Sequence, residues 1–202
     1  MKILNLYCGI GGNRKLWGED HEITAVEYKQ EIADIYHDFF PNDKIVVADA
    51  HQYLLDHYKE FDFIWSSPPC PSHSRLNKTN GVGLTEKKYP EMSLYQEIIF
   101  LQNWFKGVYC VENVLSYYDP LIPPQNIEKH YWWANFLIAS FKTGEDRGHN
   151  NRVNGLEKRK GFNLSEYNGI DKKKALRNCV EPELGKHILD CSLGLQRQQT
   201  LI

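Results

Sequence analysis

The sequence lacks the features of a membrane protein, of a disulfide-bonded secreted protein and of a zinc protein. No apolar run approaches the roughly 20 residues that a membrane-spanning helix needs, so a membrane partner is not expected. The cysteines are odd in number, contain no C-x-x-C pair and follow no secretory leader, which argues against a disulfide framework and against a metal site. We therefore predict a cytoplasmic protein with free thiols at Cys8, Cys70, Cys110, Cys179 and Cys191.

An excess of positive charge is also absent, because the formal net charge is −2. Net charge alone therefore gives no reason to expect a nucleic-acid partner. The distribution is uneven, since residues 140–178 hold ten Lys or Arg and five Asp or Glu, a balance of +5 that leaves −7 for the rest. A basic segment of this kind can follow a phosphate backbone, and it can equally be a solvated surface stretch.

The length and the order of apolar runs favour a single α/β domain. At 202 residues, of which 42% are hydrophobic, the chain can bury one core. Short β-branched or aromatic runs alternate with amphipathic stretches, a pattern typical of a doubly wound, mostly parallel sheet. We expect domain residues 1–139, a small basic insert at 140–174, and a segment at 175–202 that returns to the domain. The expected strands are 3–7, 23–26, 45–48, 61–65, 108–111 and 131–138, and the expected helices are 29–39, 51–58, 93–105 and 183–189.

A glycine-rich turn follows the first expected strand, at Cys8-Gly9-Ile10-Gly11-Gly12. Glycines there let backbone N–H groups approach a ligand closely, although the spacing departs from the dinucleotide fingerprint G-x-G-x-x-G. Glu27 ends the second strand and could accept hydrogen bonds from a ribose, and Asp49 follows the third strand and could take an adenine amino group. Each acid alone could instead cap a helix. Together the three features predict a nucleotide-type cofactor at this sheet edge.

A candidate nucleophile follows the fourth strand, in Pro68-Pro69-Cys70-Pro71. The prolines stiffen the loop and hold Cys70 at the carboxyl edge of the sheet, where α/β enzymes place their chemistry. Thiolates are strong nucleophiles even when fractionally ionised, whereas most free cysteines are buried and inert. Glu112 ends the neighbouring strand and supplies a carboxylic acid beside this loop, unless it serves as a helix cap or an ion-pair partner.

These motifs together resemble the cytosine C5-methyltransferase family. The resemblance rests on residues 6–12, on Pro68-Pro69-Cys70 with Ser74, on Glu112-Asn113-Val114 and on residues 175–184, in the family's order. It implies a Rossmann-like S-adenosylmethionine-dependent methyltransferase fold and an enzyme that methylates C5 of cytosine in DNA, releasing S-adenosylhomocysteine. The cofactor residues that it implies are Tyr7, Cys8, Gly9, Ile10, Gly11, Gly12, Glu27, Tyr28, Asp49, Ala50, Pro68, Asn178 and Val180. The implied substrate residues are Pro69, Ser74, Arg75, Asn113 and Val114.

The implied mechanism makes chemical sense of the residue types. Cytosine C5 is a poor nucleophile, so Cys70 would add to C6 and create an enamine that attacks the sulfonium methyl. A protonated Glu112 at N3 would neutralise the charge, which requires a raised carboxyl pKa. The base must be flipped out of the duplex, and Ser74 and Arg75 could hold the flanking phosphate.

Two departures from the family pattern affect the catalytic and recognition residues. The family's Gln-x-Arg-x-Arg is missing before residues 131–138, so Lys129 or His130 is the candidate for the contact to the cytosine carbonyl. The target-recognition region is also reduced to the basic insert. In this compactness the chain resembles short bacteriophage methyltransferases. Sequence reading would then rest on loop 147–160, on loop 75–90, or on a second subunit in a dimer.

Three further features leave alternatives open. Two aromatic runs, Tyr117-Tyr118 and Tyr131-Trp132-Trp133, could stack on bases or belong to the core. Gly81-Val82-Gly83 suggests a lid. An RNA cytosine C5-methyltransferase of the same fold, and a non-catalytic nucleic-acid-binding relative, are the alternative functions. The sequence does not distinguish protection in restriction-modification from regulation, nor does it identify the recognised DNA sequence.

Overall fold

The computed structural model describes residues 1–75, 89–142 and 152–194. The expected lid at 81–83, residues 143–151 and residues 195–202 lie outside the described part. The strands are β1 (Lys2–Leu6), β2 (Glu22–Glu27), β3 (Lys44–Val47), β4 (Phe63–Ser66), β5 (Val108–Val114), β6 (Gln125–Ile127) and β7 (His130–Ala134). The helices are α1 (Gln30–Phe39), α2 (Ala50–His57), α3 (Ser93–Trp104), α4 (Val153–Lys160), α5 (Lys172–Asn178) and α6 (Pro182–Ser192), with 3-10 turns η1 (Arg14–Leu16) and η2 (Tyr58–Glu60).

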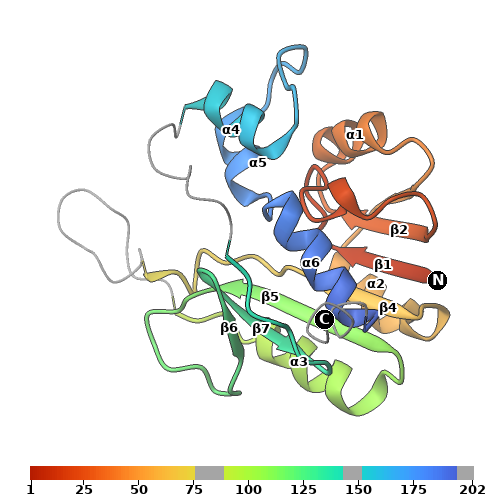
Figure 1. Ribbon diagram of the computed structural model, residues 1–202, viewed down its shortest axis with the longest axis vertical. Helices are drawn as coiled ribbons and strands as arrows, with labels where there is room; N and C mark the ends of the chain where they lie inside the picture. The colour runs from red at the N-terminus through yellow and green to blue at the C-terminus, as the bar shows by residue number, and fades with distance from the viewer. Residues whose placement is uncertain (76–88, 143–151, 195–202) are drawn as a thin grey trace, which may run out of the picture.

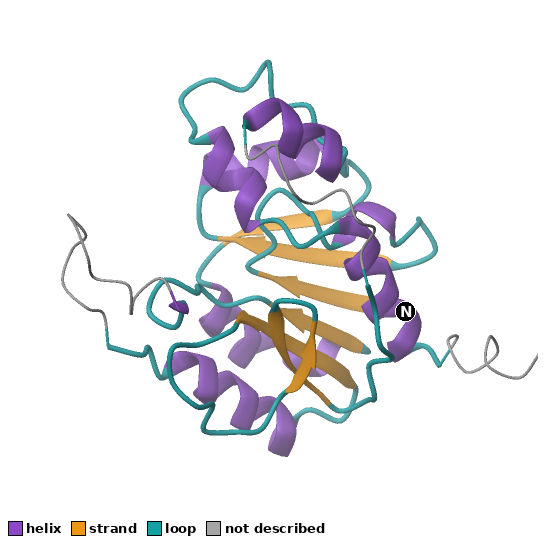
Figure 2. Cartoon of the chain, turned by 60° about the vertical axis from the view of Figure 1, so that its left-hand side comes forward, coloured by secondary structure: helices purple, strands orange, loops and turns teal. Residues whose placement is uncertain are grey.

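The strands form one seven-stranded sheet in the order β3-β2-β1-β4-β5-β7-β6. Neighbouring pairs from β3 to β5 are parallel, and β7 runs antiparallel to both β5 and β6. Helices cover both faces of the sheet, as a doubly wound topology requires (Figure 2). The predicted α/β class with a mostly parallel sheet is confirmed. Within the described residues, no helix is long and apolar enough to cross a membrane.

The period of two along each strand divides the core between the two faces of the sheet. Leu4 and Leu6 of β1 are buried against α2 and α3, whereas Ile3 is buried on the opposite face with α6. A third cluster joins the glycine-rich turn to α1, α4 and α5, which lie together at one end of the molecule (Figure 1). The glycine turn therefore lies between the sheet and helices α1, α4 and α5.

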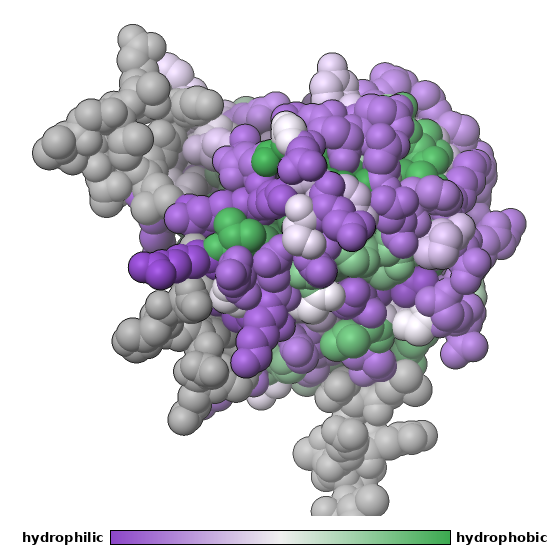
Figure 3. Space-filling model, turned by 90° about the horizontal axis from the view of Figure 1, so that it is seen from above, coloured by the Kyte–Doolittle hydropathy of each residue, from purple (hydrophilic) through white to green (hydrophobic). Residues whose placement is uncertain are grey.

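The basic segment at 140–174 is partly built into that third cluster. Leu156, Phe162 and Leu164 are at most 2% exposed and pack with Cys8 and Tyr36. Seen from above, the described surface of this end is mainly hydrophilic, with small separate apolar patches (Figure 3). The segment therefore contributes apolar side chains to the core, which its charge composition does not reveal.

Some predicted bounds were wrong for local reasons. The strand expected at 131–138 ends at Ala134, because the Asn135 side chain instead bonds the backbone of Gly107 and Tyr109. The expected loop at 147–160 contains helix α4, which ends at Gly161 in the left-handed conformation (φ 69°). Strand β6 was missed because three residues are too short for a periodic signal.

Candidate active site

The carboxyl ends of four parallel strands meet at one edge of the sheet, where α/β proteins bind ligands. The register pairs Leu6 with both Val26 and Ser66, and Ser66 with Val111. The residues that follow these positions therefore lie side by side along the edge. The sheet thereby brings together the predicted glycine turn, Glu27, the Cys70 loop and Glu112.

The glycine turn has the backbone conformation that its sequence suggests. Tyr7, Gly9 and Gly11 have φ values of 55°, 54° and 86°, a region that favours glycine and is strained for tyrosine. A Cβ on Gly11 would lie 2.3 Å from the Phe40 ring, and one on Gly12 would lie 2.6 Å from Cys179 Cβ. A Cβ on Gly9 would meet nothing within 4 Å. The turn is thus packed against the protein at Gly11 and Gly12 and open at Gly9.

The two predicted cofactor acids are both engaged by backbone amides. Glu27 accepts hydrogen bonds from the N–H of Gly9 (3.2 Å) and of Lys29 (3.1 Å), which fixes the glycine turn to the end of β2. Asp49 accepts from Gln52 N at 2.9 Å and is the N-cap of α2, the alternative that the sequence left open. Next to them, Tyr28 is 74% exposed and Ala50 begins α2. Each carboxylate retains further lone pairs for a ligand.

The C-terminal segment packs against the glycine turn. Asn178 ends α5, and Val180 lies between α5 and α6, with its carbonyl 2.6 Å from the Cβ position of Gly12. Lys160, at the end of α4, is 3% exposed and donates to Cys179 O at 2.6 Å. Its ammonium also lies 3.0 Å from Glu181. Helix α4 is therefore tied directly to the segment that packs on the glycine turn.

Glu97, a fully buried acid at the same edge, was not predicted from the sequence. Its carboxylate accepts hydrogen bonds from Tyr7 Oη (2.5 Å) and Ser66 Oγ (2.7 Å), and it lies 3.1 Å from His51 Nδ1. These partners come from the ends of β1 and β4 and the start of α2. A signal was available, since position 97 shares the buried stripe 94, 98 and 101 of α3, where an acid is unusual.

The Cys70 loop is a tight turn anchored to β5. The carbonyl of Cys70 accepts from the N–H groups of His73 (3.0 Å) and Ser74 (3.1 Å). Asn113, 2% exposed, donates from Nδ2 to Pro68 O at 3.0 Å, so its side chain positions the loop. The substrate contact expected of Asn113 and of Pro69 stays a prediction. Burial, and then the charge of Glu112, raises the pKa of the Cys70 thiol, which is therefore protonated at neutral pH.

Glu112 lies on β5 opposite Trp132 of β7. Its side chain is 11% exposed, and Oε1 is 3.6 Å from His130 Nε2. The other ring nitrogen of His130, Nδ1, is buried with no hydrogen-bond partner within the described ranges. Lys129 is exposed in the turn between β6 and β7, so of the two candidates it is His130 that contacts Glu112. Val114 pairs with His130 across the strands.

The predicted phosphate-binding residues lie on the other side of the Cys70 turn. Ser74 forms an isolated antiparallel bridge with Ser116, and the exposed Arg75 donates from Nε to Ser116 O at 3.3 Å. Through these contacts, Ser74 and Arg75 connect the Cys70 loop to the segment that follows β5. The structure places them beside the candidate nucleophile.

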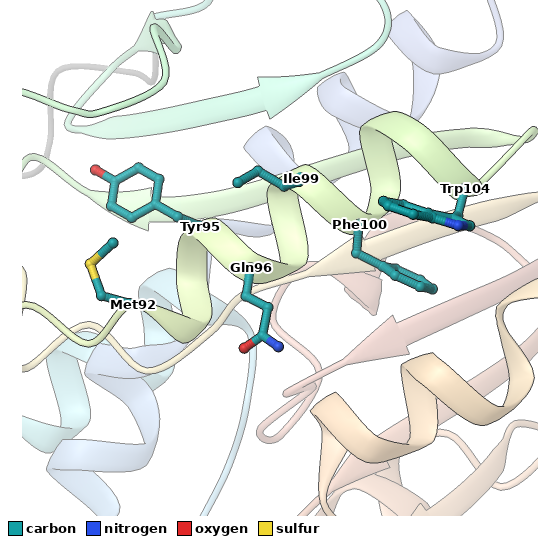
Figure 4. Close-up of a pocket in the computed structure, with 6 residues that line it drawn as sticks. All are labelled: Met92, Tyr95, Gln96, Ile99, Phe100 and Trp104. Carbon is teal, nitrogen blue, oxygen red and sulfur yellow. The ribbon is translucent and has the colours of Figure 1, made fainter.

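A separate hollow of about 410 Å³ lies along α3 and is mostly apolar (Figure 4). The rings of Phe100 and Trp104 lie nearly parallel there, with centroids 5.9 Å apart. None of the predicted site residues lines this hollow, so it is distinct from the candidate active site. Its lining residues are Met92, Tyr95, Gln96, Ile99, Phe100 and Trp104.

The sheet order and the glycine turn at its edge define the class as a Rossmann-like methyltransferase. The fold matches that of the Entamoeba histolytica methyltransferase EhMeth with a TM-score of 0.58 and 10% identity, over 96% of this chain and 98% of that one. The model of the C-5 cytosine-specific DNA methylase family matches residues 1–116, and the chain belongs to this family. The resemblance seen in the sequence is thereby confirmed.

Other comparisons cover smaller parts of the molecules. Spodoptera frugiperda DNMT2 is 31% identical over 56% of this chain, with a TM-score of 0.41. This chain covers 35% of that protein's length. Among curated protein sequences, none matches this chain. The family match includes the glycine turn, the Cys70 loop and Glu112, and it ends before His130 and before α4, α5 and α6.

Proposed function

We propose that this protein is a DNA cytosine C5-methyltransferase that uses S-adenosylmethionine and forms a covalent bond between Cys70 and C6 of the target base. One observation carries the proposal. The Cys70 loop is fixed to β5 by Asn113 and lies beside Glu112, which in turn contacts His130. A thiol, a carboxyl group and an imidazole thus converge at the sheet edge, on a chain of the cytosine-specific family.

The residues at the same edge fit the cofactor. Gly9 borders open space, Tyr28 is exposed enough to stack on an adenine, and Glu27 and Asp49 offer carboxylate oxygens to ribose hydroxyls and an amino group. Asn178 and Val180 would close the site from the C-terminal side. When bound, S-adenosylmethionine supplies an electrophilic methyl group for C5. The remaining chemistry belongs to side chains of this protein.

The charge of Glu112 links formation of the nucleophile to binding of the base. Glu112 raises the pKa of Cys70 while it is ionised, so a proton on Glu112 removes that opposition to the thiolate. We infer that the thiol proton passes through Glu112 to N3 of cytosine while sulfur bonds to C6 and the C5=C6 electron pair moves to form the enamine. Once C5 is methylated, a water molecule acting as base would take the C5 proton, and the C–H electron pair would re-form C5=C6 and expel the Cys70 thiolate. N3 would then return its proton to Glu112, which could reprotonate the thiolate.

His130 takes the place of the missing arginines in this proposal. As a donor, its buried Nδ1 could bond the cytosine carbonyl, and its Nε2 would orient Glu112. The target base must leave the stack to reach Cys70. Lys129, exposed in the turn, would then be available only to the nucleic-acid backbone. A cytoplasmic location remains part of the proposal, as does sequence recognition by loop 147–160, by loop 75–90 or by the second subunit of a dimer.

The test is a trapping experiment with mixed-sequence duplex DNA containing 5-fluorocytosine and labelled S-adenosylmethionine. Fluorine at C5 leaves no proton to remove, so the S–C6 bond persists and a labelled adduct survives denaturation. We expect the adduct from wild type and from Cys191→Ala, a control cysteine in α6, and none from Cys70→Ala. Calorimetry with S-adenosylhomocysteine should give Cys70→Ala an affinity within twofold of wild type.

Three results would count against the proposal. An adduct from Cys70→Ala would show that another residue is the nucleophile. A wild-type adduct on 5-fluorocytosine RNA, with none on DNA, would assign the enzyme to RNA. Cofactor binding with no adduct on either polymer would favour a non-catalytic relative.

A further inference from the structure

We propose that a polar cleft beside the Cys70 loop binds the nucleotide next to the target cytosine, with one base stacked on tyrosine and its phosphate on Arg75. This inference rests on the proposed function. The cleft has a volume of about 300 Å³, and its lining combines three tyrosines, one serine, one cation and one anion. The lining residues are Arg75, Ser116, Tyr117, Tyr118, Asp119 and Tyr131.

The cleft is joined to the nucleophile by the backbone. Cys70 O accepts from His73 N (3.0 Å), and His73 O accepts from Tyr117 N (3.1 Å). The bridge between Ser74 and Ser116 adds a second link. Opposite these residues, Tyr131 follows His130 directly on β7. The cleft thus borders the candidate active site from both the catalytic loop and β7, where a nucleotide next to a flipped base would lie.

The aromatic walls of the cleft are fixed in place. Tyr118 Oη lies 2.6 Å from His73 Nδ1 and 3.4 Å from Tyr95 Oη, so this ring is held by hydrogen bonds at its far end. The Tyr117 ring stands at 82° to it, with centroids 5.1 Å apart. Two rings at right angles form a corner in which a base can stack on one face and contact the edge of the other.

The charged residues determine which ligand fits the corner. Arg75 donates from Nε to Ser116 O, and among the described residues its terminal N–H groups have no other hydrogen-bond acceptor. Their planar arrangement suits a phosphate. Asp119 is exposed at the same cleft and can accept a hydrogen bond from an exocyclic amino group. Adenine, guanine and cytosine carry such a group and thymine does not. The cleft should therefore prefer an amino-bearing neighbour over thymine.

The experiment is a cycle between protein variants and substrate variants. The cytosine that wild type methylates is identified first, and its 5′ or 3′ neighbour is then replaced by an abasic site. Because stacking on an aromatic side chain is sequence-tolerant and strong, wild type should lose about tenfold in kcat/KM on one of the two substrates. Tyr117→Ala should show that loss already on intact DNA, with less than a twofold further loss on the abasic substrate.

Control variants separate stacking from folding. Tyr117→Phe keeps the ring and should behave as wild type, and Tyr167→Ala removes a tyrosine outside the cleft and should leave the abasic effect unchanged. Arg75→Ala should weaken binding to all sequences and lower the salt dependence by about one counterion. All variants should bind S-adenosylhomocysteine within twofold of wild type.

Three results would overturn the inference, and they distinguish a wrong subsite from a wrong function. If wild type methylates DNA but neither abasic site matters, or if Tyr117→Ala keeps the full abasic effect, the subsite is wrong and the proposed function stands. If wild type methylates no DNA at all, the proposed function fails and the subsite fails with it.

Discussion

Replacing Glu97 with alanine should destabilise the protein and weaken cofactor binding together. The carboxylate is fully buried and holds three partners, Tyr7, His51 and Ser66. Ser66 is itself fully buried, so its unpaired hydroxyl costs about 1–3 kcal/mol. Tyr7 and His51 are partly exposed and can bond water, which reduces their losses to about 0.5–1.5 kcal/mol each. We expect about 2–4 kcal/mol less unfolding free energy, after some relief from removing a buried charge.

The pH dependence gives a second signature of the same contact. The hydrogen bond to Glu97 raises the pKa of His51 above 6.5, against the effect of burial. A raised pKa in the folded state means that the pair stabilises the protein fully below pH 6.5 and loses this contribution as pH rises through the folded pKa. The difference in stability between wild type and Glu97→Ala should therefore shrink from pH 6 to pH 8.

Urea unfolding, followed by tryptophan fluorescence, measures the stability change. The matched control is Glu60→Ala, which removes a histidine–glutamate contact of 2.7 Å from the surface and should cost less than about 1 kcal/mol. Calorimetry with S-adenosylhomocysteine tests the link to the cofactor, because Glu97 holds Tyr7 in its strained conformation. A Glu97→Ala protein within about 0.5 kcal/mol of wild type would refute this reasoning.

Three further predictions concern the neighbouring residues. Gly12→Ala places a Cβ 2.6 Å from Cys179 Cβ and should weaken S-adenosylhomocysteine binding at least tenfold, as measured by calorimetry. An unchanged affinity would show that the C-terminal segment is not part of the site. Lys160→Met removes the donor to Cys179 O and should lower the free energy of unfolding in urea by about 1–3 kcal/mol. Lys160→Arg should have intermediate stability, and equal stability of the wild type and both variants would contradict the prediction. Glu112→Gln removes a charge that raises the Cys70 pKa, so iodoacetamide should alkylate Cys70 several-fold faster at pH 8. Mass spectrometry measures the rate, and slower alkylation would show that the charge of Glu112 does not raise this pKa.

Local sequence patterns were enough to identify the residues whose roles depend on local geometry. A glycine turn after a buried strand, prolines around Cys70, and Glu112 at a strand end all identify the sheet edge, because parallel strands bring their carboxyl ends together. The alternation of short apolar runs with amphipathic stretches predicted the class of fold and most of the central strands. These features need only the neighbouring residues in the chain to be recognised.

The contacts between side chains that are distant in the chain became known only from the folded structure. It placed His130, and not Lys129, next to Glu112, because β7 pairs antiparallel with β5 in a register that no local pattern specifies. It gave Asn113 a partner at Pro68 O and placed Cys179, far along the chain, against Gly12. Such contacts depend on long-range packing, in which the same residue type can be buried or exposed. The sequence therefore located the edge of the site, and folding determined the partners of each group within it.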